Sequence, residues 1–79
     1  MVTHRDVGKM IVLKGKTRHG KNRVQQHGTE WIIQSVANFQ GQPAMFLRSK
    51  SKTFKLGEHM IHDTRWVKLR DDPNFIYFW

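Results

Sequence analysis

The sequence predicts a small all-β domain, built as an antiparallel barrel of short strands. Helical periodicity is weak throughout, because no window of about 11 residues or more carries a clean apolar stripe at helical spacing. Short runs rich in β-branched and aromatic residues occur instead. Turn signals that contain glycine separate these runs every 8–15 residues or so, which is typical of a small barrel.

The expected elements follow one another along the chain with short connections. The predicted strands are residues 9–13, 30–39, 44–48 and 65–69. The segment Gln40-Gly41-Gln42-Pro43 predicts a hairpin turn between the second and third strands. Residues 58–63 are long enough for one short helical or 3-10 turn before the last of these strands.

The size and composition indicate one domain over residues 1–79. Cysteine is absent, which excludes disulfides, zinc–thiolate clusters and thiol nucleophiles. No apolar run approaches the roughly 20 residues that span a bilayer. Residues 1–6 lack the apolar region of a secretory signal. We therefore expect a cytoplasmic or nucleoid-associated protein.

The charge balance suggests a polyanionic partner. Lys and Arg outnumber Asp and Glu by 14 to 6, and the formal net charge is +8. Such a field attracts nucleic acid, an anionic membrane or an acidic protein surface. A membrane-surface helix needs a long amphipathic pattern, which this chain lacks. Nucleic acid, DNA or RNA, is thus the first partner to consider, and no membrane partner is expected.

Residues 15–24, GKTRHGKNRV, hold the densest basic cluster. Gly15, Gly20 and Lys21 match part of the phosphate-binding loop of nucleotide hydrolases. The next residue is Asn22, so the hydroxyl that holds Mg²⁺ is missing, and only about one helical turn precedes Gly28. A nucleotide hydrolase is therefore not expected, and a solvated charged turn remains the plain alternative.

Residues 7–24 resemble the KOW motif of small SH3-like barrels, which has an apolar strand, a glycine, a basic loop and a return strand. The positions that carry the resemblance are Met10, Val12, Gly15, Arg18 and Val24. The sequence departs from the pattern at Gly20, which stands one place late, and at Asn22, which replaces a glycine. The resemblance implies an SH3-like antiparallel barrel that binds RNA, DNA or a transcription or translation complex, with no chemistry.

A second basic cluster lies in the third strand, where Arg48, Lys50 and Lys52 alternate with small polar residues. On one strand these three side chains share a face. They serve either to protect an edge strand from aggregation or as one wall of a cationic groove along a phosphate backbone. The candidate nucleic-acid-binding residues are Lys14, Lys16, Arg18, His19, Lys21, Asn22, Arg23, Arg48, Lys50, Lys52, Phe54 and Lys55, with Phe54 as a base-stacking platform.

The C-terminal stretch is apolar on both faces if it is a strand. It therefore either closes an edge with both sides covered or packs on another molecule. The candidate partner-interface residues are Phe75, Tyr77, Phe78 and Trp79. The partner is either an acidic protein or a second copy of the chain, which makes a homodimer.

The remaining residues do not predict chemistry. His59 and His62 with nearby carboxylates offer too few ligands for a structural zinc site, so no metal or other cofactor is expected. No nucleophile, base and carboxylate set indicates an enzyme. The sequence thus predicts a nucleic-acid-binding protein that contacts the phosphate backbone with little sequence specificity. The alternative is a protein-interaction module, an adaptor or regulator of a transcription or translation complex.

Overall fold

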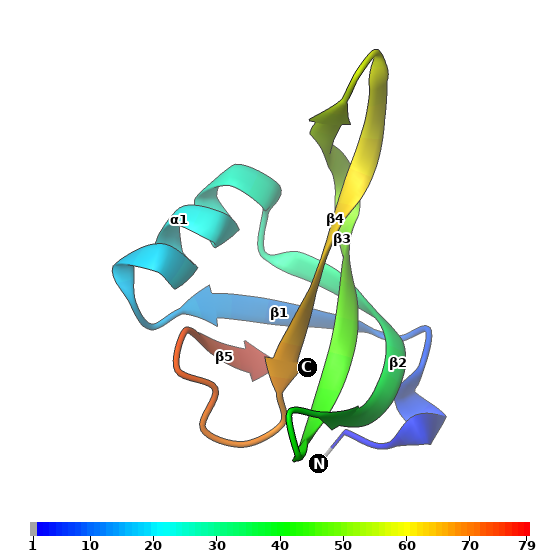
Figure 1. Cartoon of the computed structure of the whole chain (residues 1–79), viewed down its shortest axis with the longest axis vertical. Helices are drawn as coiled ribbons and strands as arrows, with labels where there is room; N and C mark the ends of the chain where they lie inside the picture. Colours follow the sequence, from blue (N-terminus) through cyan, green and yellow to red (C-terminus); the bar gives the residue numbers. More distant parts are fainter. Residues whose placement is uncertain (1) are drawn as a thin grey trace.

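The computed structural model describes residues 2–79, except for the side chain of residue 54. The chain order is one 3-10 turn, one strand, one helix and four further strands (Figure 1). The bounds of these elements are η1 (His4–Asp6), β1 (Met10–Gly15), α1 (Arg18–His27), β2 (Glu30–Phe39), β3 (Gln42–Leu56), β4 (His59–Lys68) and β5 (Phe75–Phe78).

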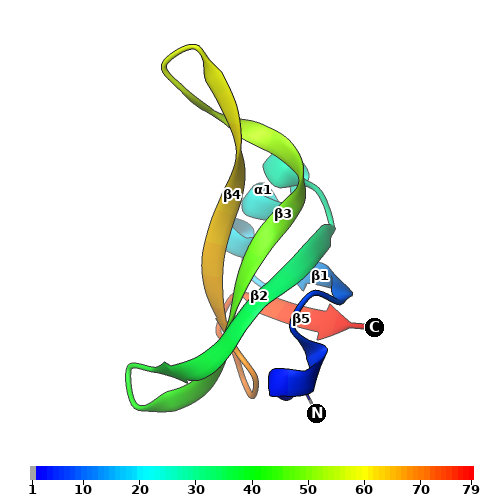
Figure 2. The ribbon, with the colours of Figure 1, turned by 90° about the vertical axis from the view of Figure 1, so that its right-hand side faces the viewer.

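The five strands form one antiparallel sheet in the order β4-β3-β2-β1-β5. The sheet is strongly curved, so that β1 and β5 cross the β3–β4 pair rather than lying parallel to it (Figures 1 and 2). The predicted class, a small all-β domain built on an antiparallel sheet, is confirmed. Curvature coincides with two irregular places, since the β2–β3 register shifts between Ile33 and Ser35 and the β3–β4 register shifts twice between Arg48 and Phe54.

The first hairpin is confirmed at the predicted place. Gln40 and Gly41 have φ values of 54° and 77°, as the type I′ turns of two-residue hairpins require. Phe39 and Gln42 are the paired strand residues on the two sides of this turn. Trp31 and Ile33 of β2, and Met45 and Leu47 of β3, point into the core at alternate positions.

The predicted helical turn near residues 58–63 is wrong, because these residues form the start of β4. The chain reverses in the two-residue turn Gly57-Glu58, with Gly57 at a φ of 61°, and Leu56 pairs directly with His59. A glycine at the first turn position is what a tight hairpin needs. The third and fourth predicted strands therefore extend well beyond 44–48 and 65–69, to 42–56 and 59–68.

The basic segment after β1 is a helix, and the expected loop and return strand are wrong. The Thr17 side chain caps the N-terminus by accepting the Gly20 N–H, and Gly28 ends the helix at a φ of 88°. Val24, which the KOW resemblance places on a strand, lies on the inner face of α1 and packs against the core. The helix was not expected because its inner face has only this one aliphatic residue.

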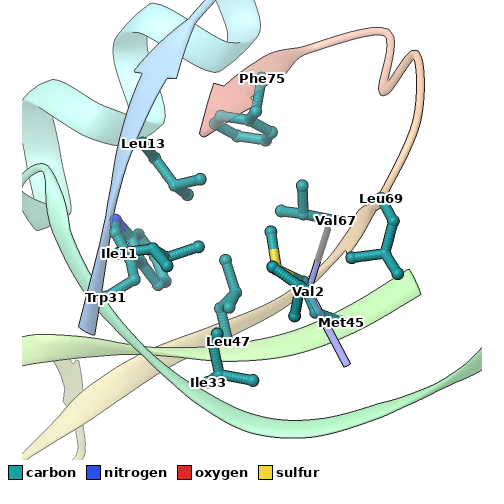
Figure 3. Packing of buried hydrophobic residues seen from close by; sticks show 10 residues of the cluster. All are labelled: Val2, Ile11, Leu13, Trp31, Ile33, Met45, Leu47, Val67, Leu69 and Phe75. Carbon is teal, nitrogen blue, oxygen red and sulfur yellow. The ribbon is translucent and has the colours of Figure 1, made fainter. Parts of the chain in front are cut away.

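The core fills the space enclosed by the curved sheet (Figure 3). Trp31 is fully buried, and its indole N–H donates to the Gly28 carbonyl at 3.0 Å. The other buried members are Val2, Ile11, Leu13, Ile33, Met45, Leu47, Val67, Leu69 and Phe75. Contributions from all five strands and from the N-terminus explain how a chain of this size reaches a closed core.

Three aromatic residues lie on the outer face of the sheet. Phe39 and Trp66 are stacked with ring centroids 4.9 Å apart, and Phe46 is tilted against Trp66 at 5.1 Å. All three are half-buried by one another. They stabilise the long strands from outside, whereas Trp31 is internal.

Candidate nucleic-acid interface

The outer face of α1 carries basic and amide side chains. Residues 14–27 contain no acidic side chain. Four of the predicted binding residues are exposed on this helix: Arg18, His19, Lys21 and Asn22. Cations in the first helical turn are unfavourable for the helix, because the N-terminal end already has a partial positive charge. A negatively charged partner would offset this cost.

The two glycines of the basic segment, Gly15 and Gly20, serve close packing. A Cβ on Gly15 would overlap the backbone of Gly20 and Lys21, and one on Gly20 would overlap the Asn74 carbonyl. The Thr17 hydroxyl also donates to the Asn74 side chain at 2.8 Å. These contacts fix the start of α1 against β1 and the segment before β5.

The second basic element is the distal part of the β3–β4 hairpin, residues 50–62, which we call the arm. The arm extends beyond the body of the domain in two perpendicular views (Figures 1 and 2). Lys50, Lys52 and Lys55 are exposed on it. The arm is polar along most of its length because both of its faces lie outside the core.

A buried polar junction joins the helix to the base of the arm. Nδ1 of His27, at the end of α1, is hydrogen-bonded to Oγ1 of Thr53 on β3 at 2.6 Å. Asp63 of β4 is buried beside them, with one carboxylate oxygen 3.5 Å from Arg23 and 3.7 Å from Nε2 of His27. The Ser49 hydroxyl accepts the Asp63 N–H at 2.9 Å. The two basic elements therefore meet at one place, and the acid between them is buried and paired.

Several predicted contact residues are already engaged within the fold. Lys16 donates to the Asp72 carbonyl at 3.1 Å, on the side of β5 rather than of the arm. Lys50 forms an exposed ion pair with Glu30 at 3.3 Å. Arg23 is held by Asp63, and Arg48 is half-buried on β3. The expected continuous wall of residues 48, 50 and 52 is also broken by the register shift after Arg48.

Of the cations on α1 and the arm, four are exposed and form no ion pair in the part of the chain that the structure describes. We call them the basic band: Arg18, Lys21, Lys52 and Lys55. Lys14 is also exposed, on the outer face of β1 opposite Ile76. The side chain of Phe54, the predicted stacking platform, lies outside the described residues.

Three of the six acidic residues lie away from the band. Asp6 lies on η1, and Asp71 and Asp72 lie in the connection from β4 to β5. Figure 1 shows these two segments at the end of the molecule opposite the tip of the arm. The Thr3 N–H and Lys9 hold the pKa of Asp6 below its usual value. Of the remaining acids, Glu58 alone lies on the arm.

The C-terminal strand divides between core and surface, which partly corrects the predicted interface. Phe75 is only 4% exposed and belongs to the core. Tyr77 packs against the core, its hydroxyl donates to the Leu69 carbonyl at 3.0 Å, and burial raises its pKa. Phe78 and Trp79 are 49% and 61% exposed. Only these last two remain candidates for a partner.

A shallow groove of about 440 Å³ runs along the free side of β5. Lys16, Lys68 and Trp79 contribute to its walls, together with Asp71 and Asp72. On the core side of this region the Arg65 guanidinium lies 4.9 Å from the Phe75 ring, and burial lowers its pKa. Its mixture of charges makes this groove a weaker polyanion site than the basic band.

Two further observations concern metals and membranes. Within residues 2–79, with residue 54 set aside, no three histidine or carboxylate residues are grouped so that they could hold a metal ion. His62 instead is hydrogen-bonded through Nδ1 to the Ser49 carbonyl at 2.7 Å. The one helix that spans ten residues, α1, is too short and too polar to cross a bilayer, and no longer helix is present in this part of the chain.

Sequence reasoning missed the junction of His27 and Asp63 and the helix that carries His27. The available signals were the capping residues Thr17 and Gly28, which flank ten residues of helical length. Neither capping residue indicates that His27 lies beside the distant carboxylate of Asp63. Comparisons of the chain with protein-family models, with curated proteins and with solved structures found no match.

Proposed function

We propose that this protein binds nucleic acid through the phosphate backbone, with the basic band of α1 and the arm as its contact surface. The observation that carries the proposal is that two separate basic elements meet at one junction, where the intervening carboxylate of Asp63 is buried and paired. A polyanion lying on this side meets cations from both elements, and the exposed acid nearby, Glu30, is paired with Lys50.

The chemistry of the band favours phosphate over base recognition. Arg18, Lys21, Lys52 and Lys55 supply charge, and amide and hydroxyl groups between them supply hydrogen bonds to phosphate oxygens. Long cationic side chains on exposed positions neutralise phosphates without requiring a particular base. Little sequence specificity is therefore expected.

The test compares two double variants that remove the same charge from different places. Lys21→Gln/Lys52→Gln removes one cation from each element of the band. Arg5→Gln/Lys9→Gln removes two cations near η1, at the opposite end. Binding to a duplex, a single-stranded DNA and an RNA is followed by fluorescence anisotropy at several salt concentrations.

Neutralising about four phosphates predicts an affinity loss of the order of 10²-fold between 50 and 200 mM salt. The Lys21/Lys52 variant should lose about half of the salt slope, and the Arg5/Lys9 variant should keep the wild-type slope. Equal losses in the two variants would indicate nonspecific attraction by net charge and would contradict the proposed surface. Absence of binding at low salt would contradict the function itself.

A second candidate function is protein interaction, and the exposed apolar face of β1 and β5 favours it. The register places Ile76 beside Lys14 and Phe78 beside Val12 on this face, and Ile76, Phe78 and Trp79 are exposed. Such a patch on a soluble domain is typical of an interface. An acidic protein or a second copy are the two partners that the apolar and basic character allows.

The test for this candidate must spare the core. Removing residues 75–79 would delete Phe75 from the core and unfold the domain, so Phe78→Ser is the appropriate variant. Sedimentation velocity tests self-association, and co-purification after nuclease treatment tests a protein partner. An association that survives nuclease and is lost in Phe78→Ser favours this function, and one that is unchanged in the variant excludes this face.

A further inference from the structure

Three apolar residues near the tip of the arm are exposed, although the arm has no core to cover. Leu56 is 62% exposed, Met60 47% and Ile61 37%. A two-stranded hairpin that extends from a domain is stabilised little by its own contacts. Exposed apolar residues at its end add an aggregation risk unless a partner covers them. They therefore need an explanation that the phosphate contacts of the band do not supply.

The strand register places these side chains on particular faces of the arm. Leu56 pairs with His59 and Lys55 pairs with Met60. Because paired residues share a face and neighbours alternate, Leu56 and Ile61 lie on one face and Lys55 and Met60 on the other. Leu56 is next to the turn at Gly57, so it is the apolar residue closest to the end of the arm.

This arrangement matches the chemistry of a protein that bends duplex DNA. Such proteins track the phosphates with cations and place apolar side chains between base steps from the minor groove. Here Lys52 and Lys55 flank the apolar tip, and two short strands provide a narrow element that can enter a groove. A lipid surface also accepts apolar and basic residues, but the band continues from the arm onto α1, far from the tip, which suits an extended polyanion.

Resting on the proposed function, we propose that the arm enters the minor groove of duplex DNA and that Leu56 inserts between base pairs and bends the duplex. Ile61 supports Leu56 on the same face. Lys52 and Lys55 contact the phosphates on the two sides of the groove. The turn residue Glu58 opposes this binding and limits its affinity.

The experiment measures bending and binding separately, with the full chain. A duplex of about 30 base pairs carries a donor and an acceptor dye at its ends, and a second duplex carries 2-aminopurine at its centre. Wild-type protein should raise energy transfer, as expected for a bend of about 20–90°, and should raise 2-aminopurine fluorescence by unstacking. Leu56→Ala should lose most of both signals while anisotropy shows affinity within about fivefold of wild type.

Matched variants control for folding and for the face of the arm. Leu56→Met keeps an apolar side chain and should retain the bend. Met60→Ala removes a similarly exposed residue from the opposite face and should also retain it. A loss of bending in Met60→Ala equal to that in Leu56→Ala would overturn the assignment of the inserting residue. Circular dichroism checks that each variant is folded.

The outcomes separate this inference from the proposed function. Binding of the duplex without a bend or unstacking overturns the inference and leaves backbone binding in place. Failure to bind any nucleic acid at low salt overturns both. Co-sedimentation with phosphatidylserine-containing vesicles that depends on Leu56, without DNA bending, would assign the tip to a membrane surface and overturn the inference.

Discussion

His27 and Thr53 are 26 positions apart in the sequence and are hydrogen-bonded at 2.6 Å, which joins the end of α1 to the base of the arm. The histidine is buried, and Asp63 lies on the other side of its ring. This contact brings together the two basic elements on which the proposed function depends. Its disruption is therefore the most direct test of the architecture.

Thr53→Val should lower the free energy of unfolding by about 1–3 kcal/mol, because a buried imidazole nitrogen loses its partner while the shape of the side chain is kept. Thr64→Val is the matched control on an exposed position of β4 and should change stability by less than about 0.5 kcal/mol. Urea unfolding followed by tryptophan fluorescence measures both. Equal effects would show that the hydrogen bond contributes nothing specific.

Gly20→Ala should destabilise the protein even though alanine is the better helix former by about 1 kcal/mol. The added methyl group would overlap the Asn74 carbonyl, and such overpacking costs about 1–3 kcal/mol. Gln25→Ala, on the exposed face of the same helix, lacks this contact and should be neutral or slightly stabilising. A Gly20→Ala variant as stable as Gln25→Ala would contradict the close packing of α1 on the segment before β5.

Alkaline pH should weaken the fold through Tyr77. Burial raises the pKa of its hydroxyl above the ordinary value of 10.0, while nearby Arg70 acts in the opposite direction. The unfolded chain therefore releases this proton at lower pH than the folded chain, so the contribution to stability is present below about pH 10 and is lost as pH rises through the folded pKa. Tyr77→Phe should lack this dependence.

The measurement for Tyr77 is the urea midpoint of wild type and Tyr77→Phe from about pH 8 to about pH 11. Wild type should be the more stable at the lower pH because its hydroxyl donates to the Leu69 carbonyl. The difference should narrow at the higher pH. A constant difference across this range would be inconsistent with the raised pKa.

Glu58→Gln should tighten binding to duplex DNA. The carboxylate lies in the turn of the arm, two residues after Leu56 and three after Lys55, where it repels phosphate. Removing one exposed charge of this kind is worth about 0.2–1 kcal/mol, or about 1.4- to 5-fold in affinity. Asp71→Asn makes the same charge change at the far end, in a backbone conformation with a φ of 51° that asparagine tolerates. Equal gains in DNA affinity in the two variants would contradict the assignment of the arm to the contact surface.

Much of the sheet could be predicted from local pattern. The second strand was expected at 30–39 and is observed there, because Trp31 and Ile33 alternate with outward-facing residues and the Gln40-Gly41 turn ends the run. The arm could not be predicted in the same way. Residues 50–56 lie outside the core on both faces, so they lack the alternation that identifies a half-buried strand.

Prediction from the sequence was limited for a different reason in the helix and in the C-terminal strand. The inner face of α1 consists of Gly20, Arg23, Val24 and His27, so backbone contact and a buried polar junction replace the apolar stripe that sequence patterns detect. In β5, side chains alternate between two faces, which places Phe75 and Tyr77 on one face and Phe78 on the other. This alternation did not indicate which of the two faces of β5 would be covered by the core.

The sequence by itself determined the all-β class, the first hairpin and a strong excess of positive charge, since strand period, turn chemistry and net charge are local or additive properties. Only the tertiary structure decided which cations are engaged within the fold, because Asp63, Asp72 and Glu30 reach Arg23, Lys16 and Lys50 through contacts between distant parts of the chain. Tertiary packing also decided that the arm extends beyond the core, since the core closes with residues of the body and leaves the tip uncovered.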